Sequence, residues 1–239
     1  MSRAGRAHLA EQLRISQDLL ARLAREADDY PRLAELQHWQ RLRLRETYED
    51  LRRQPDCAQA CLFFLEELYG GLDMRARDQQ LERALPVMSR MLPDHLLHAV
   101  GEAMRLQSIS MDFDARLSRL IEGPLDQPAY AAGYRAMAAW DERAEQIDLI
   151  GELGELLIST VRVPLIRGLV RLMQRPAHAA GFGLLQEFLA NGLDAFAAMG
   201  KKAKPFVATI VEREREALAR MRAGEDWPFR PWIGDGPEL

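Results

Sequence analysis

The chain has 239 residues, of which 48% are hydrophobic and 28% are charged, a composition that supports a packed core and excludes a disordered chain. The formal net charge of −4 argues against a protein whose main role is to hold nucleic acid, because that affinity comes chiefly from Lys and Arg side chains that neutralise phosphates. The first residues lack the apolar core of a signal peptide, and the most apolar long stretch, residues 151–173, carries too many charges to span a bilayer. We therefore expect a cytoplasmic protein whose partners include neither nucleic acid nor a membrane.

Hydrophobic residues recur at helical spacing along almost the whole chain, and no strand pattern interrupts them. The sequence predicts an all-α fold, a multi-helix bundle of about eight helices with an N-terminal helical hairpin and a non-helical C-terminal tail. In chain order, we expect helices over residues 6–27, 31–53, 55–69, 73–92 and 93–106, then a shorter helix that ends near residue 122, and further helices over 127–174, 176–200 and 201–222. Proline is expected to kink or divide two of them, at Pro86 and Pro164, and the segment Ser108–Ser110 to break another.

The N-terminal hairpin, residues 1–54, offers a candidate interface. Four leucines of its first helix share a spacing typical of a coiled-coil seam, namely Leu9, Leu13, Leu20 and Leu23. The hairpin is expected either to stand apart as an arm or to pack on the main helical domain, residues 55–225. This stripe predicts a surface for a second chain.

The tail, residues 226–239, contains Trp227 and Trp232 in a segment rich in Pro and Gly. We expect it to pack back on the bundle and cover an apolar groove. The alternative is that these two tryptophans belong to an interface with a partner.

The third expected helix is the most apolar and should be central in the core. Its cysteines, Cys57 and Cys61, are four residues apart and match no zinc spacing, so we expect reduced, buried thiols. Glu66 and Glu67 lie in the same helix, where a buried carboxylate could have a shifted pKa suited to acid–base chemistry. The plainer interpretation is that one points outward and the other pairs with an arginine.

His95 and His98 are three residues apart and can share a helix face, with Glu102 one further turn along. These side chains could act as metal ligands, but a credible metal site needs three or four donors. We therefore predict no metal and no cofactor, and expect ordinary histidines at a helix surface or interface.

Residues 63–69 spell FFLEELY, and with Arg77, Asp78 and Leu92-Pro93 they resemble an uncharacterised family of proteobacterial proteins named for that motif. The resemblance covers most of the chain after the hairpin and implies a bacterial protein. The sequence differs from the family pattern at one position. In the family a proline often follows Leu-Tyr-Gly, whereas Gly71 occupies that position here. The resemblance implies no reaction, but it marks Glu66, Glu67 and Tyr69 as positions to test.

Two functions remain open. The one we favour is a non-enzymatic helical module that binds an unknown protein partner or forms a homodimer, which requires the leucine stripe to be exposed. The alternative is a small-ligand-binding protein, or a metal-dependent enzyme, with a pocket lined by the 63–69 helix. It requires some of five candidate side chains to meet there, namely Glu66, Glu67, Tyr69, His95 and His98.

Overall fold

The computed structural model describes residues 4–68 and 74–237, and over these residues the chain forms helices joined by short turns, without a strand. The all-α prediction is confirmed. The first helices are α1 (Ala4–Arg25), α2 (Leu33–Thr47), α3 (Glu49–Arg52), α4 (Pro55–Leu62), α5 (Met74–Met91) and α6 (Asp94–Ser118). They are followed by α7 (Gln127–Met137), α8 (Trp140–Val161), α9 (Pro164–Leu172), α10 (Gln174–Ala179), α11 (Gly183–Met199), α12 (Ala203–Arg222) and α13 (Arg230–Ile233).

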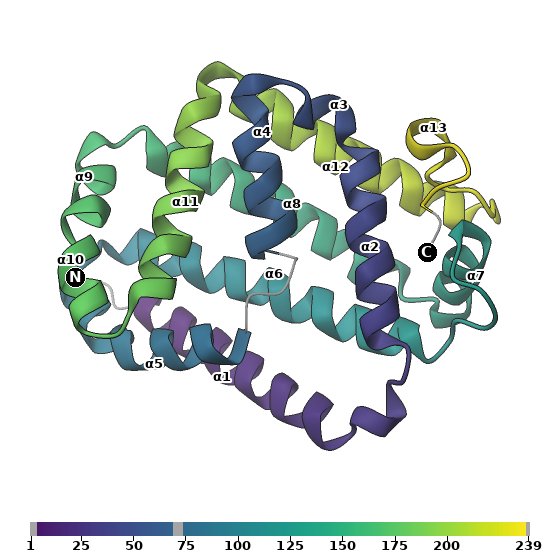
Figure 1. The fold of residues 1–239 in the computed structure, drawn as a ribbon, viewed down its shortest axis with the longest axis horizontal. Coiled ribbons are helices and arrows are strands. Elements are labelled where there is room, and N and C mark those ends of the chain that lie inside the picture. The colour runs from purple at the N-terminus through teal and green to yellow at the C-terminus, as the bar shows by residue number, and fades with distance from the viewer. Residues whose placement is uncertain (1–3, 69–73, 238–239) are drawn as a thin grey trace.

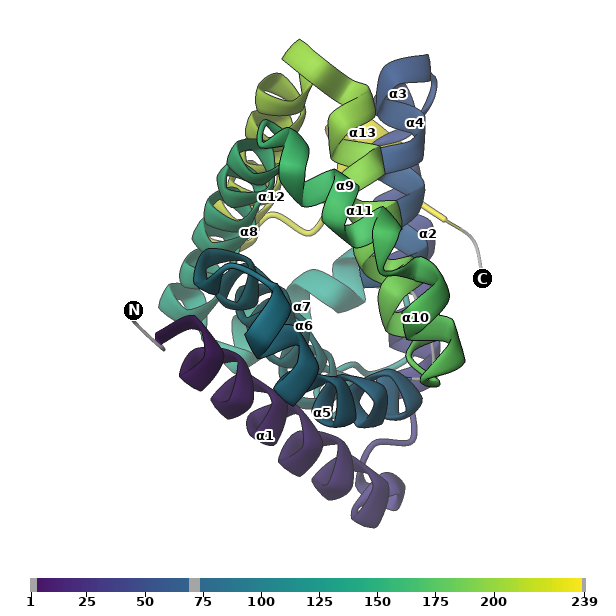
Figure 2. The same cartoon turned by 90° about the vertical axis from the view of Figure 1, so that its left-hand side faces the viewer.

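The helices cross in two layers. In Figure 1, α2, α4 and α11 run across the front of the molecule, and the turned view in Figure 2 shows α8 and α12 on the opposite side. Helix α8 packs against both α6 and α12, while α11 contacts α4 and α8 and so joins the two layers. Helices α1 and α5 lie together beside α6 at the lower edge.

The N-terminal helix is docked on the main body and does not stand apart. Helix α1 packs along α6 and α5, and three of the four predicted interface leucines are buried there, Leu9 with 0%, Leu13 with 4% and Leu23 with 9% exposure, while Leu20 is half-buried. The prediction of an exposed stripe was wrong, because the periodic leucines are covered by helices of the same chain. The hypothesis of a protein-interaction module therefore loses the exposed leucine surface on which it depended.

Two expected breaks, at Ser108–Ser110 and at Pro86, do not divide their helices. Helix α6 continues through Ser110, whose hydroxyl donates to the Leu106 carbonyl at 2.8 Å, so its polar group is satisfied within the helix and does not compete with it. Helix α5 continues through Pro86, because Leu81, Ala84 and Met88 form one buried face on both sides of the proline.

Three interruptions were missed, the first at Tyr48, which divides the predicted helix over 31–53 into α2 and α3. The predicted helix over 127–174 is divided at Ala138, an alanine with φ of 53°, as well as at Pro164, which begins α9. The next predicted helix, over 176–200, is divided at Gly181 with φ of 79°, so that α11 begins only at Gly183. A residue in the left-handed conformation ends a helix. Glycine adopts this conformation readily, so the sequence indicated the end at Gly181 but not the one at Ala138.

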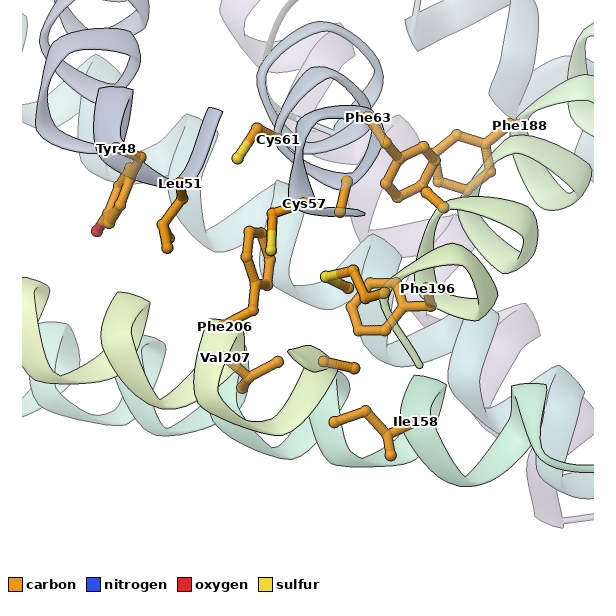
Figure 3. Close-up of a cluster of buried hydrophobic side chains, with 14 residues drawn as sticks. Tyr48, Leu51, Cys57, Cys61, Phe63, Ile158, Phe188, Phe196, Phe206 and Val207 are labelled. Atoms are coloured by element: carbon orange, nitrogen blue, oxygen red, sulfur yellow. The ribbon is translucent and has the colours of Figure 1, made fainter. Parts of the chain in front are cut away.

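Figure 3 shows the larger apolar cluster between the layers, where Phe206 of α12 stands close to Cys57 and Cys61 of α4. Both cysteines are buried and free, as predicted. Phe63 lies against Phe188 of α11, with ring centroids 5.3 Å apart. The most apolar predicted helix is therefore central in the core.

The C-terminal tail packs back on the bundle, as expected, but part of it is helical. Phe229 is 1% exposed and lies in a second apolar cluster with Trp39 and Tyr130. Trp227 and Trp232 are half-buried. Trp232 belongs to α13, a short helix with Pro231 in its first turn, where proline is tolerated. The non-helical tail was therefore predicted incorrectly at this turn.

Candidate functional site

A cavity of about 130 Å³ lies between the two layers. Its apolar wall comes from α2, α4, the turn after α4, α6, α8 and α12, and includes Leu44, Cys61, Phe64, Leu65, Leu106, Phe113, Ile150, Phe206 and Ile210. Its polar wall consists of Gln40, Arg43, Tyr48, Gln107, Ser110, Asp114, Tyr134, Arg143, Gln146 and Glu214. The cavity therefore has an apolar body and a hydrogen-bonding end.

The polar end is organised around one buried carboxylate. Arg43 Nη1 of α2 donates to Glu214 Oε1 at 2.6 Å, and Arg143 Nη2 of α8 donates to Glu214 Oε2 at 2.7 Å. The Tyr48 hydroxyl also donates to Oε1, at 2.9 Å. Each carboxylate oxygen thus accepts from one guanidinium, and the triad Arg43–Glu214–Arg143 connects three helices through buried residues.

Glutamines hold the two guanidiniums in place. Arg43 Nη2 donates to Gln40 Oε1 at 2.8 Å, and Gln40 Nε2 reaches Asp114 Oδ1 at 3.4 Å. On the other side Arg143 donates to Gln146, whose amide donates to Ser110 Oγ at 2.6 Å. Four of the six guanidinium nitrogens therefore donate to side chains of the wall before any ligand arrives, which makes the polar wall rigid.

The protonation states are fixed by these contacts. Burial would raise the pKa of Glu214, but the adjacent Arg43 and Arg143 guanidiniums lower it below its ordinary value of 4.5. Burial would lower the pKa of Arg43, but the Glu214 carboxylate raises it above its ordinary value. The triad consequently contains two cations and one anion at neutral pH.

Two further groups on the wall, Cys61 and Tyr48, are held in their neutral forms. Burial raises the pKa of the Cys61 thiol to about 12, and burial together with Glu214 raises the pKa of Tyr48 well above 10. A protonated thiol is a poor nucleophile and an ionised, doubly paired carboxylate is a poor general acid or base at neutral pH. At neutral pH, Cys61 and Glu214 are therefore better suited to contacting a ligand than to acting as nucleophile or acid–base catalyst.

The tail covers one side of the triad. The Arg43 guanidinium carbon lies 4.3 Å from the centroid of the Phe229 ring, a cation–π contact that shields the charge from water. Phe229 also contacts Tyr130, with centroids 5.7 Å apart. The aromatic tail noticed in the sequence thus contributes to the environment of the site.

The resemblance motif forms the other boundary of the cavity. Phe63–Leu68 is a π-helical turn that continues α4, and its Phe64 and Leu65 line the apolar wall. Such turns are rare and occur frequently at functional sites. Glu66 and Glu67 belong to this turn by their backbone, whereas their side chains and Tyr69 lie outside the described residues.

The predicted histidines do not line this cavity. His95 and His98 are exposed on α6, away from Phe64 and Leu65, because Leu96 and Leu97 take the buried positions of that turn. The expected meeting of the histidines with the 63–69 segment was therefore wrong for this cavity. His98 instead lies beside His8 and Glu102, at the junction of α1 and α6.

Sequence reasoning missed the central triad. One signal was that Arg43 follows Leu36 and Trp39 on a face of α2 that is otherwise buried, which is unusual for an unpaired arginine. Its partner Glu214 lies much later in the chain, among charged residues that are mostly exposed. A second signal was the position of Glu214 on the apolar face of α12, four residues from both Ile210 and Leu218.

Among the described residues, no helix is both long and apolar enough to cross a membrane. No curated protein and no solved structure matches the chain. One family model does match, over residues 20–228, and is described as a domain of unknown function. This range contains the whole cavity and most of the chain, so the protein belongs to the uncharacterised family Domain of unknown function (DUF8198).

Proposed function

We propose that this protein binds a small amphipathic molecule in the cavity between its two helical layers. One observation carries the proposal: a cavity with a continuous apolar wall ends at the buried triad Arg43–Glu214–Arg143. Ligand sites are typically apolar hollows with a few fixed polar groups that set orientation. A core built for stability alone gains little from such a triad, because buried ion pairs can be replaced by apolar residues without loss of stability.

The size of the cavity limits the ligand. Its volume is about 130 Å³, and an apolar cavity of ~150 Å³ in a protein can hold benzene. The occupant should therefore be no larger than a single ring of about six non-hydrogen atoms whose head group enters the polar end.

The polar end selects the head group. Arg43 Nε is buried and has no hydrogen-bond partner among the described side chains, so an oxygen acceptor on the ligand would satisfy it. Two guanidiniums disfavour a cationic head. A hydroxyl or carboxylate attached to a ring or a short branched chain fits both walls.

The test is thermal unfolding of the purified protein with phenol, benzoate and benzylamine, after native mass spectrometry has established whether a molecule is retained. Ligand at about 100 times Kd stabilises the folded state by about 2.7 kcal/mol, which for a chain of this size is a rise of roughly 5–10 °C in Tm. We expect that rise for a compound with an oxygen head and none for benzylamine.

Ile150→Phe supplies the matched variant, because Ile150 lines the cavity and a larger side chain there fills it. Ile15→Phe makes the same change at a side chain that is 38% exposed and outside this cavity. Stabilisation by the ligand should disappear in the first variant and persist in the second. Equal stabilisation of both variants, or neither a retained molecule nor a shift with any of the three compounds, contradicts the proposal.

A further inference from the structure

His8 of α1, His98 of α6 and Glu102 of α6 bring three donor atoms within 4.8 Å of one another. The two imidazole rings lie with centroids 4.6 Å apart, and His8 Nε2 lies 2.5 Å from Glu102 Oε1. His98 and Glu102 are four residues apart, so they occupy the same face of α6, and His8 approaches that face from the neighbouring helix.

A glycine makes this approach possible. A side chain at Gly101 would place its first carbon 2.6 Å from His8 Cδ2, which is closer than such atoms can approach. Gly101 thus leaves the space on α6 that the His8 ring occupies. The imidazole is held against the helix that carries the other two donors.

The buried His8 nitrogen lies against the Glu102 carboxylate. Nε2 of His8 is buried and makes no hydrogen bond of acceptable geometry to a described residue, although the Glu102 oxygen is close. An ion between them would be a partner for both atoms.

We propose that His8, His98 and Glu102 bind a divalent transition metal of the zinc class and thereby tie α1 to α6. Two imidazoles and one carboxylate are the donor set of three-ligand zinc sites, in which a fourth position is left to water. The exposed side of His98 leaves room for that water. Tetrahedral bonds of about 2.0–2.1 Å place donors about 3.3 Å apart, so side-chain shifts of about 1 Å complete the site.

This site is independent of the central cavity, whose lining includes none of the three residues. Its role follows from its position: it cross-links the N-terminal helix to α6 at a point remote in sequence. The competing cation is Arg105, which lies 3.4 Å from Glu102.

The test uses Zn²⁺ in competition with a chromophoric chelator, and Co²⁺ for its visible absorption, on the full chain. His98→Ala removes a donor that is exposed and therefore leaves the core intact, while His95→Ala is the matched control, an exposed histidine one turn earlier on the same helix. We expect one Zn²⁺ per chain, a higher Tm with Zn²⁺, and a loss of affinity of about tenfold or more in His98→Ala and His8→Ala. Arg105→Ala should bind Zn²⁺ more tightly.

His95→Ala should bind as the unmodified protein does, and the Co²⁺ complex should show the intense visible bands of four-coordinate geometry. The proposal is overturned if the unmodified protein binds no stoichiometric Zn²⁺, or if His98→Ala and His95→Ala bind it equally well. Because His98→Ala leaves the central cavity untouched, failure here says nothing about ligand binding there.

Discussion

Glu214 of α12 lies 2.6 Å from Arg43 of α2, and both side chains are almost completely shielded from water although they are far apart in sequence. The same carboxylate holds Arg143 of α8 at 2.7 Å. Removing one member of a buried ionic cluster leaves an uncompensated charge, which costs more than the cluster itself contributes.

Glu214→Gln should therefore lower the free energy of unfolding by about 3–5 kcal/mol, measured by urea denaturation. The control is Glu216→Gln, two residues along the same helix, where the carboxylate pairs with Arg220 at the surface. That change should stay within about 1 kcal/mol. A small effect at Glu214 would mean that the two guanidiniums are satisfied by other groups.

The depressed pKa of Glu214 makes stability depend on pH in a defined direction. Because its folded-state pKa lies below the ordinary 4.5, the unfolded state binds a proton more readily as the pH falls toward and below that value. The contribution of Glu214 is fully present well above pH 4.5 and is lost as the pH falls through the folded-state pKa.

Other carboxylates with a lowered pKa, among them Asp50 and Asp194, also reduce the stability of the fold at acid pH. The effect of Glu214 is therefore measured by comparing Glu214→Gln with the unmodified chain. The slope of unfolding free energy against pH between pH 5 and 3 should be shallower in Glu214→Gln than in the unmodified chain. Identical slopes would show that Glu214 does not titrate differently in the folded state.

The buried thiols give a direct measure of how closed the cavity is. Burial raises the pKa of Cys61 to about 12, and the thiolate is the reactive form. Both cysteines should react with a chromogenic disulfide at pH 8 far more slowly in the native protein than in urea. A compound that fills the cavity should slow Cys61 further, since Cys61 lines the wall. Rapid native-state reaction would show frequent opening of the layer that contains α4.

The features that sequence reasoning identified correctly depend on neighbours in the chain. Helical periodicity, the proline that begins α4 at Pro55 and the apolar surroundings of Cys57 are all local, and each was found where it was expected. The same periodicity revealed the leucine stripe of α1 but not which helix covers it. Amphipathicity shows that a face is buried and leaves open whether its partner is the same chain or another.

The features that it missed depend on distant contacts. Arg43, Arg143 and Glu214 become neighbours only when α2, α8 and α12 pack, and no local pattern links them. His8 and His98 likewise become neighbours only when α1 packs against α6. The sequence around His95 and His98 therefore does not reveal His8 as a third donor. Sites built across layers are visible only in the fold.

Gly154 of α8 lies against Val207 of α12. A side chain there would place its first carbon 2.6 Å from both methyl groups of Val207. Gly154→Ala should therefore destabilise the fold by about 1–3 kcal/mol through overpacking, and Val207→Ala should recover part of the loss in the double variant. Gly168→Ala in α9, where nothing lies within 4 Å, should instead stabilise by about 0.4–1 kcal/mol. Opposite signs in urea denaturation test the predicted packing, and equal effects contradict it.

Ala138 ends α7 in the left-handed conformation, with φ of 53°, and its side chain is exposed. An L-residue with a side chain costs about 1–2 kcal/mol there, whereas glycine adopts the conformation freely. Ala138→Gly should therefore stabilise the protein by about 1 kcal/mol, a rise of roughly 2–4 °C in Tm for a chain of this size. The control is Ala132→Gly, at an exposed position inside α7. Glycine there should lower stability by a similar amount, because a glycine loses more conformational entropy than an alanine when it becomes helical on folding. If both substitutions lower Tm in a thermal melt, the chain does not turn at Ala138, and α7 and α8 continue as the single helix that their sequence predicts.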